Sequence, residues 1–333
     1  MDIRDDWLKQ TKEEIEDPDL PICDPHHHLW DFPGNRYLLE DLVADVRSGH
    51  NVVSTVFMEC GVMYNVDSPQ TLQPVGETEF VNGIAAISAS GAYGALRVCA
   101  GIVGFADLCL GERVAEVLDA HLMASSRFRG VRHAVGWDSS ESIRNSHTNP
   151  RESLLLDGTF REGFKELGKR GLSFDAWLYH PQLEELGDLA QAFPHTTIIL
   201  NHFGGPLGIG EYEGKREEIF HCWKENIRTL SEYPNVFAKL GGLVMPINGF
   251  GFHRKSKPPG SDEIVSATNR YYRHVIDCFG PDRCMFESNF AVDKQSVSYH
   301  ILWNAFKKMA ADFSPSERAD LFYGTAARVY RLN

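Results

Sequence analysis

Eight short apolar runs alternate with helical segments along the chain, and this alternation constrains the fold most. Each run is rich in β-branched or aromatic residues and has the length of a buried strand. Strands that alternate with helices form parallel sheets, and eight such units in about 300 residues predict a single (β/α)8 barrel, the TIM-barrel fold. The predicted strands cover residues 21–28, 52–59, 97–104, 128–133, 172–179, 196–202, 235–241 and 283–289.

The helical segments carry their own start and stop signals. Residues 181–193 begin with proline and repeat apolar side chains every three to four positions, and residues 261–279 begin with Ser261 as a cap. Residues 297–310 are helical in pattern, and residues 314–317 form a capping box that opens a last helix. A doubly wound sheet is the alternative, but no glycine-rich nucleotide motif follows the first strand. We expect an N-terminal extension, residues 1–20, and one barrel domain, residues 21–333.

The composition limits which binding partners and which cellular compartment we expect for this chain. The net charge of −13 disfavours nucleic acid and anionic membranes, and no apolar run is long enough to span a bilayer. The acidic N-terminus lacks a signal-peptide core, and the 7 cysteines form no C-x-x-C pair. We expect a cytoplasmic protein with reduced thiols that acts on a small molecule, and the sequence is compatible with a homo-oligomer.

The first predicted strand ends in a histidine pair. Residues 24–28 read Asp-Pro-His-His-His, so His26 and His28 stand two positions apart. Alternate residues of a strand face the same way, and two imidazoles that project together can hold a metal ion or grip a substrate oxygen. A solvated, histidine-rich loop start is the competing interpretation.

Chemistry in such a barrel gathers at the C-terminal ends of the strands. The predicted strand ends are polar. Loops commonly begin with polar residues, but this does not explain why histidine and arginine are so frequent here. In chain order they carry His26 and His28, Glu59, residues 104–107, Arg129 with Arg132 and His133, Tyr179 and His180, Asn201 and His202, Lys239 with Gly241 and Gly242, and Glu287 with Asn289.

These motifs give the chain a specific resemblance. The order and spacing of five of them are those of amidohydrolase family 2, within the amidohydrolase superfamily. The chain resembles the lactonase branch, which includes 2-pyrone-4,6-dicarboxylate lactonase and the sugar-acid lactonases, and the family's decarboxylases are more distant. The motifs are residues 24–28, 128–132 (Phe-Arg-Gly-Val-Arg), 199–206 (Ile-Leu-Asn-His-Phe-Gly-Gly-Pro), 283–290 (Arg-Cys-Met-Phe-Glu-Ser-Asn-Phe) and 324–330 (Gly-Thr-Ala-Ala-Arg-Val-Tyr).

The resemblance implies a site built on His26, His28 and His202. In metal-dependent members these histidines help to bind a divalent ion, for which zinc is the first expectation. In some lactonases they polarise the lactone carbonyl without a metal, and both alternatives stay open here. The chain departs from the family on the last strand. The family's Gly-Ser-Asp-Trp is Glu-Ser-Asn-Phe at residues 287–290, so Asn289 replaces the aspartate that activates water.

Because of this replacement, we expect another residue to act as the general base. An amide takes up no proton near neutral pH, so Asn289 orients water or substrate instead. Asp293 is the first candidate base because it follows the last strand, and Glu287 and Glu59 are the other two. Each has a structural alternative: Asp293 as a helix cap, and either glutamate as the partner of an arginine.

Basic residues near the strand ends indicate an anionic substrate. Arg132, beside His133, is the expected carboxylate anchor, and Arg129 is the alternative. The long loop of residues 243–260 is expected to cover the site. The further residues expected around the substrate are Tyr179 and His180 after the fifth strand, with His180 alternatively capping the next helix, and Phe250, Phe252 and His253 in the long loop.

The sequence therefore predicts a hydrolase that opens a lactone or related cyclic ester bearing a carboxylate. The histidines polarise the carbonyl, directly or through a metal, while a carboxylate deprotonates water. Two alternatives stay open. One is metal-dependent decarboxylation of an aromatic or dienoic acid. The other is a barrel that has lost catalysis and only binds a small ligand, which the replacement of the last-strand aspartate supports.

Overall fold

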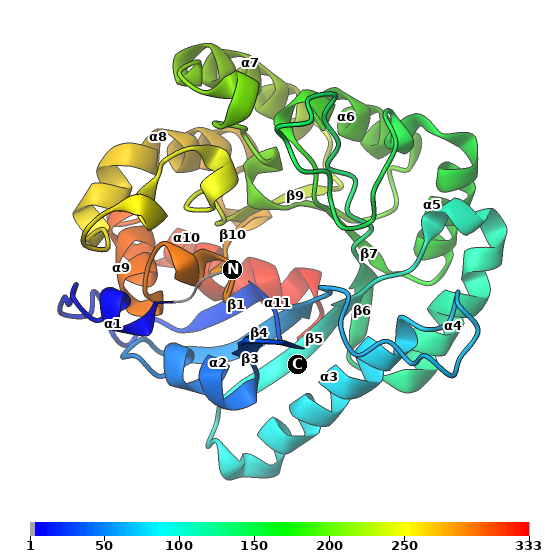
Figure 1. The fold of residues 1–333 in the computed structure, drawn as a ribbon, viewed down its shortest axis with the longest axis horizontal. Coiled ribbons are helices and arrows are strands. Elements are labelled where there is room, and N and C mark those ends of the chain that lie inside the picture. Colours follow the sequence, from blue (N-terminus) through cyan, green and yellow to red (C-terminus); the bar gives the residue numbers. More distant parts are fainter. Residues whose placement is uncertain (1–3, 333) are drawn as a thin grey trace.

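The computed structural model describes residues 4–332, in which eight parallel strands form a barrel surrounded by helices (Figure 1). The strands pair in chain order, and the chain beyond the last strand returns to the first. There the His28 amide donates to the Phe290 carbonyl (2.7 Å) and the Asn289 amide to the His26 carbonyl (2.9 Å). The predicted (β/α)8 barrel is confirmed. Its strands are β1 (Ile22–His27), β4 (Val52–Met58), β5 (Arg97–Gly104), β6 (Phe128–Val131), β7 (Ser173–Ala176), β8 (Ile198–Leu200), β9 (Val236–Leu240) and β10 (Cys284–Phe286).

Helices form the outer ring, and shorter elements decorate it (Figure 1). The longer helices are α2 (Leu39–Val46), α3 (Val75–Ile87), α4 (Val114–Ala124), α5 (Gly158–Lys169), α6 (Leu183–Ala192), α7 (Arg216–Ser231), α8 (Ser261–Phe279) and α9 (Tyr299–Met309). The shorter elements are α1 (Asp5–Leu8), the hairpin of β2 (Trp30–Phe32) and β3 (Asn35–Tyr37), α10 (Pro315–Ala319) and α11 (Thr325–Val329). Among the described residues, no helix is both long and apolar enough to cross a membrane.

Single helical turns occupy many of the connections. The 3₁₀ turns are Leu108–Arg113, Leu154–Leu156, His180–Gln182, His202–Gly204, Gly210–Tyr212, Pro246–Asn248, Phe252–Arg254, Pro281–Arg283 and Asp293–Gln295, and the π turns are Ser88–Ala92 and Asp320–Gly324.

All eight predicted strands are present, but most end earlier than predicted. The last was expected to reach residue 289, whereas β10 ends at Phe286. The residues beyond it leave extended geometry, as Asn289 does with a φ of 54°. Polar side chains at the strand ends thus belong to short connecting segments, which aim them across the barrel mouth.

The helix predictions hold with one correction. Helix α8 spans the predicted residues, but Gly260 occupies the cap position and Ser261 is the first helical residue. Glu13 takes over the capping role from outside the helix, because its carboxylate accepts bonds from the Ser261 amide (2.8 Å) and hydroxyl (2.5 Å). The predicted capping box is confirmed at α10, where the Ser314 amide donates to Glu317 (2.8 Å).

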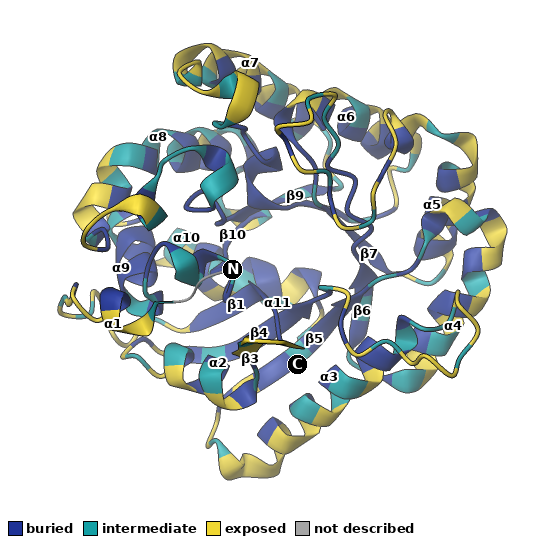
Figure 2. Ribbon diagram, in the orientation of Figure 1, coloured by how far each residue is buried: buried dark blue, intermediate teal, exposed yellow. Residues whose placement is uncertain are grey.

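Buried residues lie along the strands and on the helices around them (Figure 2). Their apolar side chains form a large cluster and a smaller cluster inside the barrel. The interior cluster combines strand residues such as Val56 and Ile199 with Ala326, Val329 and Tyr330 from the C-terminal segment. That segment packs closely under the strands, since a Cβ on Gly101 would lie 3.0 Å from the Leu332 side chain. The barrel is therefore a packed core, and chemistry is confined to its mouth.

Replacing Glu13 tests the cap that the N-terminal segment supplies to α8. Glu13→Ala should lower the free energy of unfolding by about 1–3 kcal/mol, because donors on Ser261 and Asn304 lose their partner. Burial would raise the pKa of Glu13, but hydrogen bonds from Ser261 and Asn304 hold it below its usual value. Such a carboxylate stabilises the folded state above its unfolded pKa, and the contribution is lost as pH falls through the folded value.

Urea titrations at several pH values measure this effect. The full difference should be present at pH 7 and should fade below about pH 4. Glu14→Ala is the matched control, because the neighbouring Glu14 side chain is exposed. Equal losses in both variants would contradict the capping role of Glu13.

Candidate active site

Three buried side chains converge at the C-terminal end of the barrel. His26 comes from the end of β1, His202 follows β8 and Glu287 follows β10. His26 Nδ1 lies 2.7 Å from Glu287 Oε2, and His202 Nδ1 lies 2.6 Å from Glu287 Oε1. Each residue thus points one ligand atom toward a shared centre, and the three atoms lie within 4.8 Å of one another.

Two glycines after β9 make room for this cluster. A Cβ on Gly241 would lie 2.5 Å from Glu287 Cγ and 2.2 Å from the Glu287 carbonyl oxygen. A Cβ on Gly242, whose φ is +80°, would lie 2.5 Å from His202 Nδ1. Both positions therefore require glycine for the two side chains to approach each other.

The backbone at two of the strand ends is held in the left-handed region. His202 has a φ of 52°, Phe203 of 60° and Asn289 of 54°. Asparagine tolerates this conformation, but bulky residues adopt it at a cost of order 1–3 kcal/mol. Strain at His202 is typical of a side chain whose position matters for function.

Burial keeps the histidines of β1 neutral. Removal from water, followed by the nearby charges of Lys239, His202 and Arg132, lowers the pKa of His26 well below its usual value. Burial likewise lowers the pKa of His28, whose Nδ1 lies 2.9 Å from the Met58 carbonyl oxygen. An Nδ1–H bond to that carbonyl leaves His28 Nε2 with a free lone pair. Neutral imidazoles are suited to be metal ligands.

Lys239 supports the cluster from inside the barrel. Its ammonium group lies 3.5 Å from His26 Nδ1 and 4.0 Å from Glu287 Oε2, with no exposure to solvent. It donates to Asp175 Oδ1 (2.8 Å), which also accepts bonds from the Tyr330 hydroxyl (2.8 Å) and the Asn201 amide (3.0 Å). The buried ammonium thus has a carboxylate partner, as buried charges require.

A second ion pair lies on the other side of His26. Arg132 Nε donates to Glu59 Oε1 (2.6 Å), and Arg132 Nη2 donates to the Glu59 carbonyl (2.5 Å). His147 Nε2 lies 3.1 Å from Glu59 Oε2. Burial would raise the pKa of Glu59, but Arg132 and His147 lower it to about 2. Glu59 is therefore a weak base, while Arg132 Nη1 stays 3.4 Å from His26 Nε2.

Asn289 and Asp293 form a pair beside the cluster. Asn289 Nδ2 donates to Asp293 Oδ1 (3.0 Å), and Asp293 Oδ2 has no hydrogen-bond partner among the described residues. Burial, together with the charge of Glu287, raises the pKa of Asp293 well above its usual value. The side chain points to Asn289 instead of capping the turn that begins at Asp293, and a raised pKa brings a carboxylate closer to the range where a base is effective.

The outer expected residues occupy separate positions. His133 packs between Phe105 and Phe160, and its Nδ1 accepts from the Leu108 amide (3.2 Å). The Tyr179 hydroxyl donates to the Arg144 carbonyl (2.5 Å), and His180 Nδ1 accepts from the Leu207 amide (3.3 Å). These contacts tie the three side chains to the surrounding loops.

The long loop after β9 borders a cavity of about 260 Å³ that it shares with the loop after β8. His253 lines this cavity, but His26, His202 and Glu287 do not, so the expected cover over the site stays a prediction. Phe250 and Phe252 do not line it, contrary to expectation. They stack on each other with ring centroids 5.9 Å apart, and Phe250 packs on Tyr271 of α8. The two 3₁₀ turns of the loop direct both rings into the core.

The prediction for one arginine was wrong, because this residue lies at the opposite end of its strand. Arg129 was expected beside Arg132 at a C-terminal strand end, but it lies near the start of β6 and donates to the Tyr330 carbonyl (2.7 Å). Strand β6 has only four residues, Phe128–Val131, so Arg129 lies near one end of it although Arg132 follows directly after the other end. Only Arg132 reaches the cluster.

Two residues that contact the site residues, Trp177 and His147, were not predicted, because no sequence pattern marks them. Trp177 packs on both His202 and Tyr179, with ring centroids 4.9 and 5.7 Å away. His147 sits in a loop, far in sequence from Glu59. Asp175 and Lys239 did carry a signal, because each is a charged residue within an apolar strand, which indicates a buried ion pair.

The donor set fits a divalent metal ion. His202 Nδ1 and both Glu287 carboxylate oxygens are buried and have no hydrogen bond of ordinary geometry among the described residues, despite their short separations. Buried polar atoms without partners are costly, and nitrogen and oxygen atoms that converge without hydrogen bonds are typical of metal ligands. Glu287 is the anionic donor of this set, whereas the amide of Asn289 is neutral.

Comparison with known proteins identifies the family. Residues 23–332 match the profile of Amidohydro_2, described as Amidohydrolase. The chain belongs to the amidohydrolase family. It is 35% identical to the uncharacterized protein y4mH of Sinorhizobium fredii over 94% of this chain and 99% of that protein. It is 27% identical to an L-fucono-1,5-lactonase of Burkholderia multivorans over 70% of this chain and 72% of that protein.

A solved structure supports the fold of this amidohydrolase. A zinc-bound amidohydrolase from Burkholderia multivorans superimposes with a TM-score of 0.71 at 21% identity, covering 94% of this chain and 99% of the other. The chain is thus a lactonase-like member of the family and an enzyme of the hydrolase class.

Gly242→Ala tests whether space next to His202 is required. The added Cβ should displace the His202 ring, and turnover should fall by at least about tenfold. Gly214→Ala is the matched control, because Gly214 has a φ of +78° with no atom within 4 Å of an added Cβ. Thermal unfolding should show a cost of about 1–2 kcal/mol for the control and more for Gly242→Ala. Equal costs with unchanged turnover would remove this constraint from the site.

Proposed function

We propose that this amidohydrolase hydrolyses a lactone or related cyclic ester that bears a carboxylate. The observation that carries the proposal is the buried convergence of His26, His202 and Glu287 at the barrel mouth. The relationship to an L-fucono-1,5-lactonase supports a cyclic ester as the class of substrate.

A divalent ion, zinc first, would be held by His26, His202 and Glu287, with His28 beside them. Such an ion polarises a carbonyl oxygen and lowers the pKa of water. The protein's own part is to present neutral imidazoles and an unpaired carboxylate at fixed positions. Lys239 contacts His26 and Glu287 from inside the barrel, and Gly241 and Gly242 permit Glu287 and His202 to approach each other.

The charges around the cluster agree with both the ion and an anionic substrate. Two cations, Arg132 and Lys239, face the carboxylates of Glu59, Asp175 and Glu287, and Asp293 adds a fourth when it is ionised as a base, so the formal sum is 2 − 4 = −2. A divalent ion would bring the sum to zero and would remove the net repulsion of a substrate carboxylate. Arg132 Nη1 is the nitrogen left to meet that carboxylate.

Asp293 is the proposed general base, and Asn289 positions the attacking water. The hydrogen bond between them aligns the carboxylate with the barrel mouth. His133, Tyr179, His180 and His253 are proposed to shape the substrate pocket from the surrounding loops.

Glu287→Gln tests the metal site. The amide keeps the shape of the side chain but removes the anionic ligand, so metal content in purified protein should fall well below that of the wild type. Elemental analysis by mass spectrometry measures it, and His202→Ala should behave alike. Glu14→Gln, at an exposed position, should leave the metal content unchanged. Wild-type protein that binds no divalent ion and keeps full turnover with a chelator would rule out this site.

Asp293→Asn tests the base. The rate should fall by a factor on the order of 10² or more, because the water loses its proton acceptor. The wild-type rate should rise with pH as Asp293 ionises, at a pKa above the usual carboxyl range, and this acid limb should flatten in the variant. Asp67→Asn on the surface serves as the control. An unchanged acid limb would assign the base to another group.

A panel of carboxylated lactones tests the reaction itself. Ring opening with release of one proton is the expected outcome, and it should be lost in His202→Ala. Release of carbon dioxide from aromatic or dienoic acids would instead assign decarboxylation. Tight binding of a lactone without turnover would indicate a barrel that only binds its ligand.

A further inference from the structure

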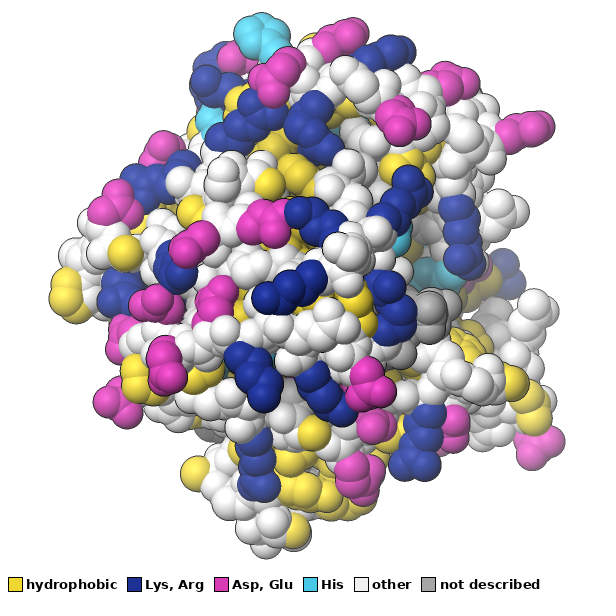
Figure 3. All heavy atoms as spheres, turned by 60° about the vertical axis from the view of Figure 1, so that its left-hand side comes forward, with side chains coloured by type: hydrophobic (Ala, Val, Ile, Leu, Met, Phe, Trp, Pro, Cys, Tyr) yellow, Lys and Arg dark blue, Asp and Glu magenta, His cyan; other side chains and the backbone are white. Residues whose placement is uncertain are grey.

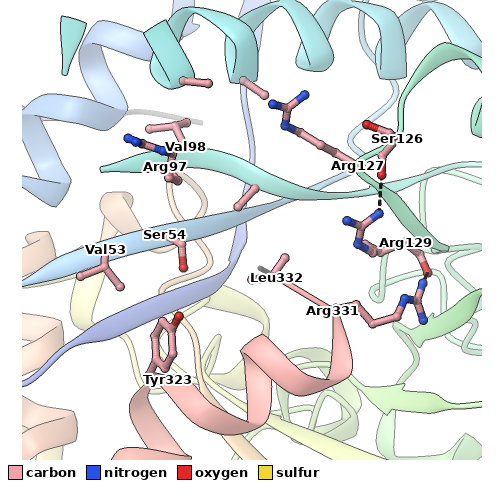
Figure 4. Close-up of a pocket in the computed structure, with 13 residues that line it drawn as sticks. Val53, Ser54, Arg97, Val98, Ser126, Arg127, Arg129, Tyr323, Arg331 and Leu332 are labelled. Atoms are coloured by element: carbon pink, nitrogen blue, oxygen red, sulfur yellow. Dashed lines mark hydrogen bonds between the residues drawn. The ribbon is translucent and has the colours of Figure 1, made fainter. Parts of the chain in front are cut away.

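A cavity of about 440 Å³ lies at the end of the barrel opposite the candidate active site (Figure 4). Its walls are the first residues of β4 and β5, the start of β6, helix α3 and the segment after α11. The volume falls within the range of small-molecule sites. Since the site described above occupies the strands' C-terminal ends, this cavity forms no part of it.

Four arginines line the cavity, and none is paired with a carboxylate among the described residues. Their hydrogen bonds go to neutral groups: Arg97 to the Gly94 and Leu96 carbonyls, Arg127 to Asn82, Arg129 to the Ser126, Phe128 and Tyr330 carbonyls, and Arg331 to the Gly171 and Arg129 carbonyls. Burial lowers the pKa of Arg129, and repulsion by the like charges of Arg331 and Arg127 lowers that pKa further.

One other face of the molecule, which Figure 3 shows, differs from the cavity in its charge pattern. On the side that carries α1, α8 and α9, basic and acidic side chains alternate (Figure 3). Ion pairs there include Lys308 with Asp262 (2.6 Å) and Arg273 with Asp312 (2.8 Å). A chain with a net charge of −13 has acidic residues in excess, yet none of those described neutralises the cavity. Gathering like charges costs free energy unless an anion compensates it.

Hydroxyl groups complement the arginines. Ser54 is only 7% exposed, and its Oγ has no hydrogen-bond partner of ordinary geometry among the described residues, lying beside the Cys23 thiol. Figure 4 shows Arg127, Arg129 and Arg331 gathered at one end of the cavity, with Ser54, Tyr323 and Arg97 at the other. Among residues 4–332, no carboxylate lines the cavity to accept from either group of donors.

We propose that this cavity binds a small organic or inorganic oxyanion that carries two or more negative charges. Guanidinium groups recognise carboxylate and phosphate oxygens through paired N–H donors, and three of them at one end suit one doubly charged group. The hydroxyls of Ser54 and Tyr323 donate to oxygens at the other end. Leu332, Ala85 of α3 and Ala89 of the π turn that follows it contact the carbon skeleton of an organic ligand.

Isothermal titration calorimetry with the full chain tests the proposal. Inorganic phosphate and citrate are the two probes, in buffer of constant ionic strength set by sodium chloride, and stronger binding of one assigns the phosphate or the carboxylate class. The double variant Arg127→Gln/Arg331→Gln should weaken binding at least about tenfold, since each lost guanidinium removes charge-assisted bonds.

A double variant Arg36→Gln/Arg228→Gln is the matched control. It removes the same charge at exposed positions away from the cavity and should bind like the wild type. Far-ultraviolet circular dichroism without ligand shows whether each variant is folded, and the single variant Arg97→Gln, at the other end of the cavity, gives a second test with citrate. No binding to the wild type, or equal binding to both double variants, would overturn the proposal.

Discussion

Burial of the Glu287 carboxylate is the constraint around which the barrel mouth is organised. A carboxylate without access to water requires partners, and His26, His202 and Lys239 surround it at 2.7, 2.6 and 4.0 Å. The buried ammonium group of Lys239 in turn requires a carboxylate partner, which Asp175 provides, so each buried charge is compensated by another. The short contacts to the imidazoles lack hydrogen-bond geometry, and this observation supports the proposed binding site for a divalent cation.

The two ends of the barrel are physically connected. Arg129 at the N-terminal end bonds to the Tyr330 carbonyl, and the Tyr330 hydroxyl bonds to Asp175, the partner of Lys239. The C-terminal segment therefore both closes the barrel and completes the charge network under the site. Charge is also divided between the ends: the mouth combines carboxylates with cations, whereas the opposite cavity holds arginines that no described carboxylate neutralises.

Sequence reasoning located the site better than it assigned roles within it. Eight apolar runs predicted the barrel, and the barrel rule brought His26 and His202 together although 176 positions separate them (202 − 26). It misplaced Arg129, because a strand of four residues puts both of its ends within one short motif. It considered Glu287 as a base or as the partner of an arginine, and did not foresee its contacts with His26 and His202, because period-two alternation says which face a side chain takes and nothing about the atoms it meets.

The sequence by itself determined the fold class, and it predicted both the end of the barrel that holds the candidate site and the residues, His26 and His202, that meet there. These follow from periodicity and residue type, which are local properties of the chain. Only the tertiary structure decided that Glu287 meets both histidines, that Glu59 is held by Arg132 and that Asp293 faces Asn289. Those outcomes depend on distances of about 3 Å across different strands, set by barrel closure and by glycines that admit close approach.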